Sequence, residues 1–419
     1  MRGYDRVVLF KNAVETLGYF SEQIAIELEQ QGIETYFIDY DNLYQTLGEL
    51  PHFLKKGSAA LLTFNFIGLS GEEVFLTEEG VTIWEACEMR ILNILVDHPM
   101  YYHDKLEKIW RNMKVFCIDR EHVSYIGRFY QHVDCTFLPS AGNIRADMEL
   151  SFLRDARAAT SGVVYRDYEK IWDYEKDLLP LEKRKWDIVF TGNYVPTYFF
   201  EQRIGAQGKE YRDFYFGMIE DLLERPWQTM DAVLEAHIRA ESGELSETDL
   251  RAVLGNLVFI DQWVRSEVRS RVISQLLEQD LKLYLVGADW DLFPCKKPWN
   301  MKCSGEMVSS VSCIEAIQNA KISLNVMPWF RDGTHDRIFT AMLQKTVSVT
   351  DESRYLQKHF TDEKELLFYS LTETEALPQR LKRLLAHPEE MEAIAEKGFE
   401  KASREYTWRE NTNRILKLS

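Results

Sequence analysis

The stretch from Ile322 to Ser353, ISLNVMPWFRDGTHDRIFTAMLQKTVSVTDES, predicts a strand, a polar loop, a helix and a second strand in quick succession. The predicted elements are a strand over 322–326, a flexible turn with a plausible N-cap at Gly333 and Thr334, a helix over 337–343 and a strand over 347–350. In an open α/β sheet, ligands bind outside the carboxyl ends of the strands, where a helix N-terminus attracts anions. The stretch therefore predicts a site for a phosphate-bearing ligand.

The size and charge of the chain limit the classes of protein to consider. Its 419 residues exceed what one hydrophobic core usually holds, so we expect two domains with a cleft between them. Fifty basic and 67 acidic residues give a net charge of −17, which argues against nucleic acid or an anionic membrane as the main partner.

The six cysteines form no CxxC pair, so we expect reduced core thiols. The amino terminus is too short in its apolar part for a signal peptide, and no apolar run approaches ~18 residues, so we expect a cytoplasmic protein without an integral membrane segment.

Strand and helix signals alternate in the first third of the chain, which predicts a parallel, doubly wound sheet. The run RVVLF, a helix from Tyr19 to Gln31 and the run ETYFIDY form an opening βαβ unit. The first strand continues into FKNAVETLGYF, which lacks the GxGxxG fingerprint and argues against a dinucleotide cofactor. Further strands are predicted over 59–66, 91–96, 115–118 and 135–138.

A rise in charge around Pro180, followed by the strand signal DIVFTGNY from Asp187, predicts a domain boundary. We therefore assign residues 1–180 to a first Rossmann-like domain and residues 181–419 to a second, which ends in closing helices. A long helical pattern predicts a helical insertion in the second domain at about 205–265, with a capping box at SETD. The predicted fold class is α/β, with two Rossmann-like doubly wound domains facing a cleft.

One loop-to-helix junction gathers small, capping, imidazole, acidic and guanidinium groups, namely Asp332, Gly333, Thr334, His335, Asp336 and Arg337. Arg337 in the first helical turn opposes the helix dipole unless an anion lies nearby. A diphosphate would satisfy both the guanidinium group and the free N–H groups. The alternative is a salt bridge from Arg337 to Asp332 or Asp336. The position of the motif at a strand end favours the anion site.

Asp97 and His98 follow the strand signal ILNILV at its carboxyl end, where functional loops lie. A carboxylate beside an imidazole raises its basicity, so the pair is a candidate base for removing a proton from an alcohol. The alternative is an N-cap aspartate with a hydrogen-bonding histidine, and the sequence leaves both open. The motif DREH at 119–122 lies on the same rim or forms a polar helix start. His98 and His103 lack the spacing of metal ligands, and no cysteine or cluster of carboxylates lies near them in the sequence, which argues against a metal site.

Two glycine turns complete the expected donor-binding residues of the second domain. Gly192 and Asn193 follow its first strand, where glycine permits close approach of a ligand. Gly287 and Asp289 hold the equivalent place after LKLYLV, which suits a contact to a nucleobase or ribose. Tight turns are the alternative explanation for both glycines.

The run GTHDRIFTAML, with the following VSVTD, resembles the carboxyl-terminal domain of bacterial glycosyltransferases of the spore-maturation CgeB-like group, within the GT-B superfamily. FTGN, SLNVMP and the closing LPQRLKRLLAHPEEMEAIAEKGFEKASREYTW support the resemblance, which is best over 187–408 outside the helical block. The resemblance implies a GT-B fold with a nucleotide-sugar held mainly by the second domain, an acceptor held by the first and no required metal. It places Arg337 at the donor diphosphate.

The expected function is therefore a metal-independent glycosyltransferase of the hexosyltransferase type, with no cofactor and a nucleotide-sugar donor, most readily a UDP-sugar. Its acceptor would be a hydroxyl of a glycan, protein or small molecule. Many relatives carry two glutamates eight positions apart, but Asp332 and Thr340 stand there in this chain, which leaves Asp336 or Asp289 for the ribose. The alternative is a non-catalytic nucleotide- or glycan-binding partner protein of the same fold. A nicotinamide-dependent oxidoreductase is disfavoured by the missing glycine fingerprint.

Overall fold

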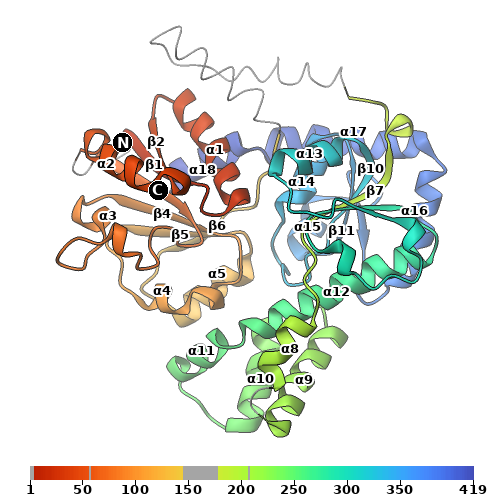
Figure 1. Cartoon of the computed structure of the whole chain (residues 1–419), viewed down its shortest axis with the longest axis horizontal. Coiled ribbons are helices and arrows are strands. Elements are labelled where there is room, and N and C mark those ends of the chain that lie inside the picture. Colours follow the sequence, from red (N-terminus) through yellow and green to blue (C-terminus); the bar gives the residue numbers. More distant parts are fainter. Residues whose placement is uncertain (1–3, 56–57, 145–177, 206–207) are drawn as a thin grey trace. The chain divides into compact units, whose positions relative to one another are not determined.

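The computed structural model describes residues 4–55, 58–144, 178–205 and 208–419, which Figure 1 colours along the chain. They divide into two compact units. The first unit is Met1–Asp177 with Ser309–Val311 and Glu405–Ser419, and the second is Leu178–Val308 with Ser312–Arg404. The change from first to second unit after residue 177 lies close to the domain boundary that the sequence predicts at 180.

The described part of the first unit contains a six-stranded parallel sheet in the order β2-β1-β3-β4-β5-β6. Its strands are β1 (Arg6–Lys11), β2 (Glu34–Asp39), β3 (Ala59–Phe64), β4 (Arg90–Leu95), β5 (Met113–Cys117) and β6 (Cys135–Phe137). Every residue of β3 is buried, as expected for a parallel strand that is covered on both faces. The order reverses between β1 and β3, which is the topological switch point of this sheet.

The helices of the first unit follow the predicted alternation with strands. They are α1 (Glu15–Gln30), α2 (Leu43–Phe53), α3 (Ile83–Ala86), α4 (His103–Glu107) and α5 (Arg120–Phe129). α1 begins four residues earlier than the sequence predicts, at Glu15 in place of Tyr19. The doubly wound arrangement itself is confirmed.

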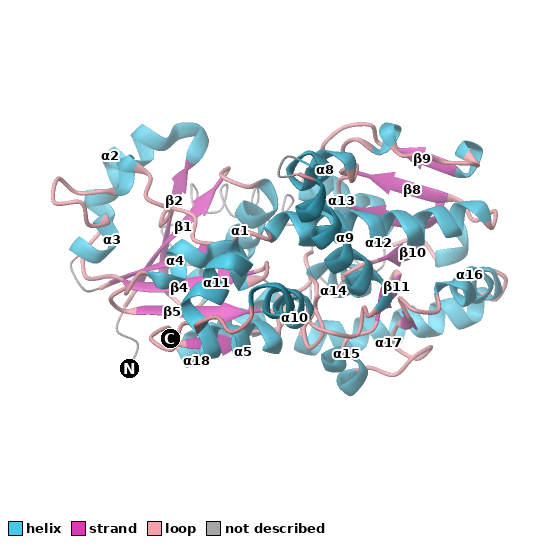
Figure 2. Cartoon of the chain, turned by 90° about the horizontal axis from the view of Figure 1, so that it is seen from below, coloured by secondary structure: helices cyan, strands magenta, loops and turns pink. Residues whose placement is uncertain are grey.

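The second unit repeats this design in its described residues, with a six-stranded parallel sheet in the order β12-β11-β10-β7-β8-β9. Its strands are β7 (Trp186–Thr191), β8 (Leu283–Val286), β9 (Met301–Cys303), β10 (Ala320–Leu324), β11 (Val347–Asp351) and β12 (Leu367–Tyr369). Its switch point lies between β7 and β10. Figure 2 shows the strands of each unit in magenta with helices alongside them. β9 was not predicted, because its three residues alternate too briefly to give a strand signal.

A run of helices separates β7 from β8 and begins and ends outside the predicted insertion at 205–265. It consists of α8 (Tyr198–Gly205), α9 (Lys209–Glu224), α10 (Met230–Ser242), α11 (Glu247–Gly255) and α12 (Val258–Glu278). Figure 1 shows α8 to α11 grouped together beyond the sheet. The capping box before α11 is confirmed, because the Ser246 hydroxyl accepts a 3.1 Å hydrogen bond from the Asp249 backbone N–H. The remaining helices around this sheet are α13 (Ser310–Gln318), α14 (Asp336–Leu343), α15 (Arg354–His359), α16 (Leu377–Leu385) and α17 (Pro388–Glu405).

The last helix, α18 (Trp408–Leu418), belongs to the first unit, although the sequence assigned all of 181–419 to the second domain. Its blue ribbon lies beside the red α1 in Figure 1. The Trp408 ring packs 5.1 Å from that of Phe20, and its indole N–H donates a 2.9 Å hydrogen bond to the Asn143 side-chain oxygen. The predicted closing helices are α16, α17 and α18, with Pro388 as the first residue of α17.

We expect the substitution Trp408→Ala to lower the free energy of unfolding of the first unit by about 3 to 5 kcal/mol, because it empties a buried site and removes an indole hydrogen bond. Urea unfolding followed by circular dichroism measures this loss. Trp299→Ala is the matched control, since Trp299 is 72% exposed and its loss should change stability by no more than about 0.5 kcal/mol. Equal effects of the two variants would contradict the packing described for α18.

Candidate functional site

The candidate site lies in the second unit, at the carboxyl ends of β7 and β10, on the switch point of its sheet. After β7 the chain continues through Gly192 and Asn193, and after β10 a loop leads to α14. The Gly192 backbone has a φ of +142°, and a Cβ at this position would lie 3.2 Å from a terminal nitrogen of Arg337. Glycine suits this position because L side chains rarely adopt such a φ, and Arg337 also approaches it closely.

The turns after β7 and β8 are in direct contact. The Asn193 side-chain oxygen accepts a 2.9 Å hydrogen bond from the Ala288 backbone N–H. A Cβ on Gly287 would lie only 2.5 Å from the Gly192 carbonyl oxygen. Asp289 adopts the left-handed conformation (φ 65°) and starts the turn that follows β8. Tight packing of these two turns accounts for both glycines, and it brings Gly192, Asn193, Gly287 and Asp289 to one rim of the sheet.

Two arginines share the ring of Phe190, the buried residue near the end of β7. The guanidinium carbon of Arg337, in the first turn of α14, lies 5.8 Å from the ring centroid, and that of Arg269, on α12, lies 5.3 Å from it. Arg269 also donates a 2.9 Å hydrogen bond to the Asn193 carbonyl oxygen. Within the described ranges, no carboxylate lies within salt-bridge distance of either guanidinium group. The salt bridge from Arg337 to Asp332 or Asp336, which the sequence left open, is thus not formed.

The positive groups of this cluster are buried and repel one another. Burial, with repulsion from Arg337 and Arg265, lowers the pKa of Arg269 to about 9. Burial also lowers the pKa of Arg337, against the opposing effect of Asp336. Burial and the neighbouring arginines hold the pKa of His335 well below its usual range, so this imidazole is neutral at pH 7. An anion placed among these groups would relieve the repulsion between them.

Arg269 and Arg265 were not predicted as site residues. They lie four positions apart in the run WVRSEVRSRV, and so on one face of α12, in a segment assigned to the helical insertion. Arg265 forms a 3.0 Å ion pair with Asp261, whose carboxylate is buried. The sequence feature that could have pointed to these residues is two like charges on one helix face, only one of which has a carboxylate four positions before it.

The loop before α14 differs in detail from its prediction. α14 begins at Asp336, and its N-cap is His335, whose side chain makes no capping hydrogen bond. Thr334, the expected cap region, is fully buried, and the Gly333 carbonyl accepts a 2.8 Å hydrogen bond from the Ser353 hydroxyl. The His335 ring nitrogen Nδ1 lies 3.4 Å from the Asp336 carboxylate. The backbone of this loop is therefore fixed, and α14 presents its first turn without a side-chain cap.

Asp97 and His98 lie in the first unit, after β4. The Asp97 carboxylate accepts hydrogen bonds from the Asn65 side-chain amide (3.0 Å) and the Tyr102 hydroxyl (3.4 Å). His98 is buried, and its Nδ1 accepts a 3.1 Å hydrogen bond from the Met100 backbone N–H at the start of a short 3₁₀ turn. Its proton is therefore on Nε2, and the imidazole acts as a helix cap. Asn65 has a φ of 51°, a rare conformation that marks this strand end as a constrained place.

The DREH motif starts α5. The Asp119 carboxylate accepts a 2.6 Å hydrogen bond from the Glu121 backbone N–H and is the N-cap of this helix. The Arg120 guanidinium lies 4.2 Å from the Phe137 ring centroid. The His122 ring lies 4.7 Å from that of His98. The polar helix start is thus the correct interpretation of Asp119, while His122 does share a rim with His98.

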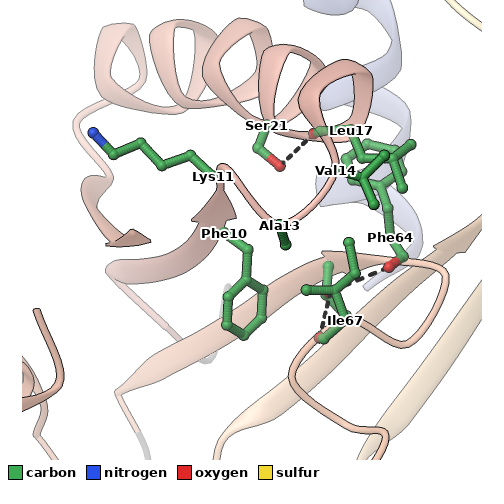
Figure 3. A pocket seen from close by; sticks show the side chains of 10 residues that line it. Phe10, Lys11, Ala13, Val14, Leu17, Ser21, Phe64 and Ile67 are labelled. Carbon is green, nitrogen blue, oxygen red and sulfur yellow. Dashed lines mark hydrogen bonds between the residues drawn. The ribbon is translucent and has the colours of Figure 1, made fainter. Parts of the chain in front are cut away.

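A shallow hollow lies beside α1 at the switch point of the first sheet, and Figure 3 shows its lining. Phe10, Val14 and Ile67 are among its apolar side chains, which leave no enclosed space large enough for a water molecule. Lys11 extends away from these side chains, and its ammonium nitrogen lies 3.3 Å from Asp39. The hollow is therefore apolar packing.

No helix among the described residues is long and apolar enough to cross a membrane. No group of three or more histidine, cysteine, aspartate or glutamate side chains in the same residues is placed to hold a metal ion.

Comparison with known families and structures places this geometry in context. The sequence model of the glycosyl transferase-like family matches residues 265–417. Comparison with curated proteins gives no match. The Anabaena protein HepE in complex with UDP-glucose is similar in structure, with a TM-score of 0.51, 9% identity and coverage of 98% of each chain. A glycosyltransferase from Rickettsia africae has a TM-score of 0.50 at 9% identity, covering 99% of this chain and 97% of its own.

The N-terminal domain of trehalose-6-phosphate phosphatase from Candida albicans is also similar, with a TM-score of 0.50, 10% identity and coverage of 100% of this chain and 98% of its own. At such low identities these likenesses show the fold. They confirm the predicted class of two parallel, doubly wound α/β units. The chain therefore has the fold of the GT-B glycosyltransferases, and its residues 265–417 carry the sequence pattern of the glycosyl transferase-like family.

Proposed function

We propose that this protein transfers a sugar, of the hexosyl type, from a nucleotide-sugar donor to an acceptor hydroxyl without a metal ion. The observation that carries the proposal is the pair Arg337 and Arg269, which share the Phe190 ring at the switch point and have no carboxylate partner in the described residues. Glycosyl transfer from a nucleotide-sugar releases a nucleoside diphosphate, whose leaving group gains negative charge as the bond breaks. Fixed guanidinium groups stabilise that charge as a metal ion would.

The donor would bind with its diphosphate between Arg337 and Arg269 and against the open first turn of α14. The rim formed by Gly192, Asn193, Gly287 and Asp289 lies beside this position and would receive the remainder of the nucleotide. HepE, which has the same fold, was solved with UDP-glucose and with UDP, so a UDP-sugar is the first donor to test. The CgeB-like assignment rests on the motif GTHDRIFTAML and stays a prediction.

The acceptor would be held by the first unit, with Asp97 as the candidate base. Its carboxylate is oriented by Asn65 and Tyr102, and it stands at the carboxyl end of β4. His98 caps the following turn through Nδ1 and so fixes the backbone that follows Asp97. This arrangement divides the predicted pair, with Asp97 as the base and His98 as a positioning group.

A non-catalytic binding protein is the second candidate. Thr340 favours it, because this residue is 3% exposed inside α14 at the place where many relatives carry a ribose-binding glutamate. A threonine there cannot supply a carboxylate to the sugar ring of the nucleotide. Nucleotide binding without turnover would distinguish this candidate from an enzyme.

We expect Arg337→Ala and Arg269→Ala each to weaken UDP binding by about tenfold to hundredfold, since each removes a charge-assisted contact of roughly 1.5–3 kcal/mol. Isothermal titration calorimetry in the presence of EDTA measures this loss and tests metal independence at the same time. Arg271→Ala is the matched control, because Arg271 lies on the same helix as Arg269 but is exposed and paired with Glu267. Unchanged UDP affinity in both site variants would refute the proposed donor site.

We expect Asp97→Asn to lower kcat by about a hundredfold or more while donor affinity stays constant, because the amide keeps the shape of the side chain but cannot take a proton. The measurement is sugar transfer or hydrolysis from a panel of UDP-, GDP- and dTDP-sugars. Asp104→Asn, an exposed carboxylate in the nearby α4, serves as the control. A kcat equal to that of the unmodified protein would exclude Asp97 as the base and point to a reaction that retains the sugar configuration.

A further inference from the structure

The loop between β10 and α14, residues 325–335, is joined to the end of β11 and to the chain segment that follows it. Hydrogen bonds connect the two segments along their length. They run from Asn325 N–H to the Val349 carbonyl (2.7 Å), from Met327 N–H to the Asp351 carboxylate (2.7 Å), from Arg354 N–H to the Arg331 carbonyl (2.8 Å) and from the Ser353 hydroxyl to the Gly333 carbonyl (2.8 Å). The end of β11 and the segment after it therefore set the path of the loop that leads to Arg337 in α14.

Asp351 is the central group of this connection. It is the last residue of β11 and is completely buried. One carboxylate oxygen accepts the Met327 N–H, and the other lies 3.5 Å from a terminal nitrogen of Arg331. Arg331 is itself buried, at 9% exposed, and also donates a hydrogen bond to the Pro328 carbonyl. One carboxylate thus contacts the loop at its beginning and at its middle.

We propose that Asp351 and Arg331 are positioning residues for donor binding, which hold the loop in the shape that presents Arg337 and the first turn of α14 to the diphosphate. This inference rests on the proposed function. Neither residue needs to touch the donor. A displacement of a binding group by about 1 Å is enough to weaken its interaction strongly, so a loop fixed by a buried ion pair is a direct way to preserve the site.

The cost of keeping a carboxylate at this position supports a role in function. Burial raises the pKa of Asp351 to about 6, against the effects of Arg331 and the Met327 N–H, while Glu352 adds to the rise. The other titratable neighbour is Tyr369 on β12, whose pKa is raised by burial and by Asp351. A buried carboxyl group with a raised pKa stabilises the fold at low pH, where it is protonated. This contribution is lost as the pH rises through about 6 and the group ionises. At pH 7 the ionised Asp351 therefore destabilises the fold, and a purely structural role would favour asparagine.

The substitution Asp351→Asn distinguishes a role in positioning the loop for donor binding from a role in stabilising the fold. The amide oxygen can still accept the Met327 N–H, but it gives Arg331 no ionic partner. We expect the difference in melting temperature between the variant and the unmodified protein to increase by about 4 °C, in favour of the variant, as the pH rises from 4.5 to 7.5. Over the same pH range we expect the donor affinity of the variant to fall relative to that of the unmodified protein. At pH 7.5 the variant should bind roughly tenfold more weakly, and at pH 5 the difference should shrink to about twofold, because Asp351 is then mostly protonated in the free protein.

The binding experiment uses calorimetry with UDP-glucose, GDP-glucose and dTDP-glucose, whose diphosphate groups do not titrate between pH 5 and pH 8. Asp187→Asn is the matched control, since Asp187 forms a 2.6 Å ion pair with Lys321 at the amino end of the same sheet. The control should bind as the unmodified protein does at both pH values. Equal affinity of Asp351→Asn at pH 7.5 overturns the inference, and so does a tenfold loss that persists at pH 5.

Hydrogen exchange of the free protein tests the same inference without a ligand. We expect the amides of residues 326–335 to exchange about tenfold faster in Asp351→Asn at pH 7.5, with no change in Asp187→Asn. Unchanged exchange in this loop overturns the inference. If the unmodified protein binds none of the three nucleotide-sugars, the proposed function fails, and the exchange result still decides whether Asp351 holds the loop.

Discussion

Two positive charges that lie close together, with no carboxylate within salt-bridge distance among the described residues, are the feature on which the proposed site of the second unit depends. Arg337 and Arg269 reach the same Phe190 ring from different helices, and burial lowers the pKa of both. A fold would ordinarily separate such groups or pair them with carboxylates, because repulsion in a partly buried setting is costly. Their proximity is explained most simply by an anion that both of them bind.

The parallel sheet makes this arrangement possible. Because β7 and β10 are neighbours that continue in opposite directions along the sheet, the segments after them separate and leave the Phe190 ring accessible to α12 and α14. The close turns at Gly192 and Gly287 bring the backbone to the same rim. The described contacts of Asp351 then fix the remaining loop. The proposed donor site thus depends on where the strands end, and less on any single motif.

Much of the fold was predictable because parallel strands give long apolar runs and α14 follows its strand within a short distance. Arg337 could be predicted for the same reason, since its position in the first helical turn is visible in the sequence. The position of Arg269 could not be predicted, because its proposed role depends on α12 returning from a long helical segment to the sheet. The return of α18 to the first unit also escaped prediction, since only the tertiary contacts of Trp408 reveal it.

The most direct test of the central claim is a crystal structure of the protein with UDP. The account predicts diphosphate oxygens within hydrogen-bond distance of the guanidinium groups of both Arg337 and Arg269, with the phosphates against the first turn of α14. A structure in which UDP binds elsewhere, or in which both arginines keep their present contacts and leave the diphosphate to other groups, would contradict it.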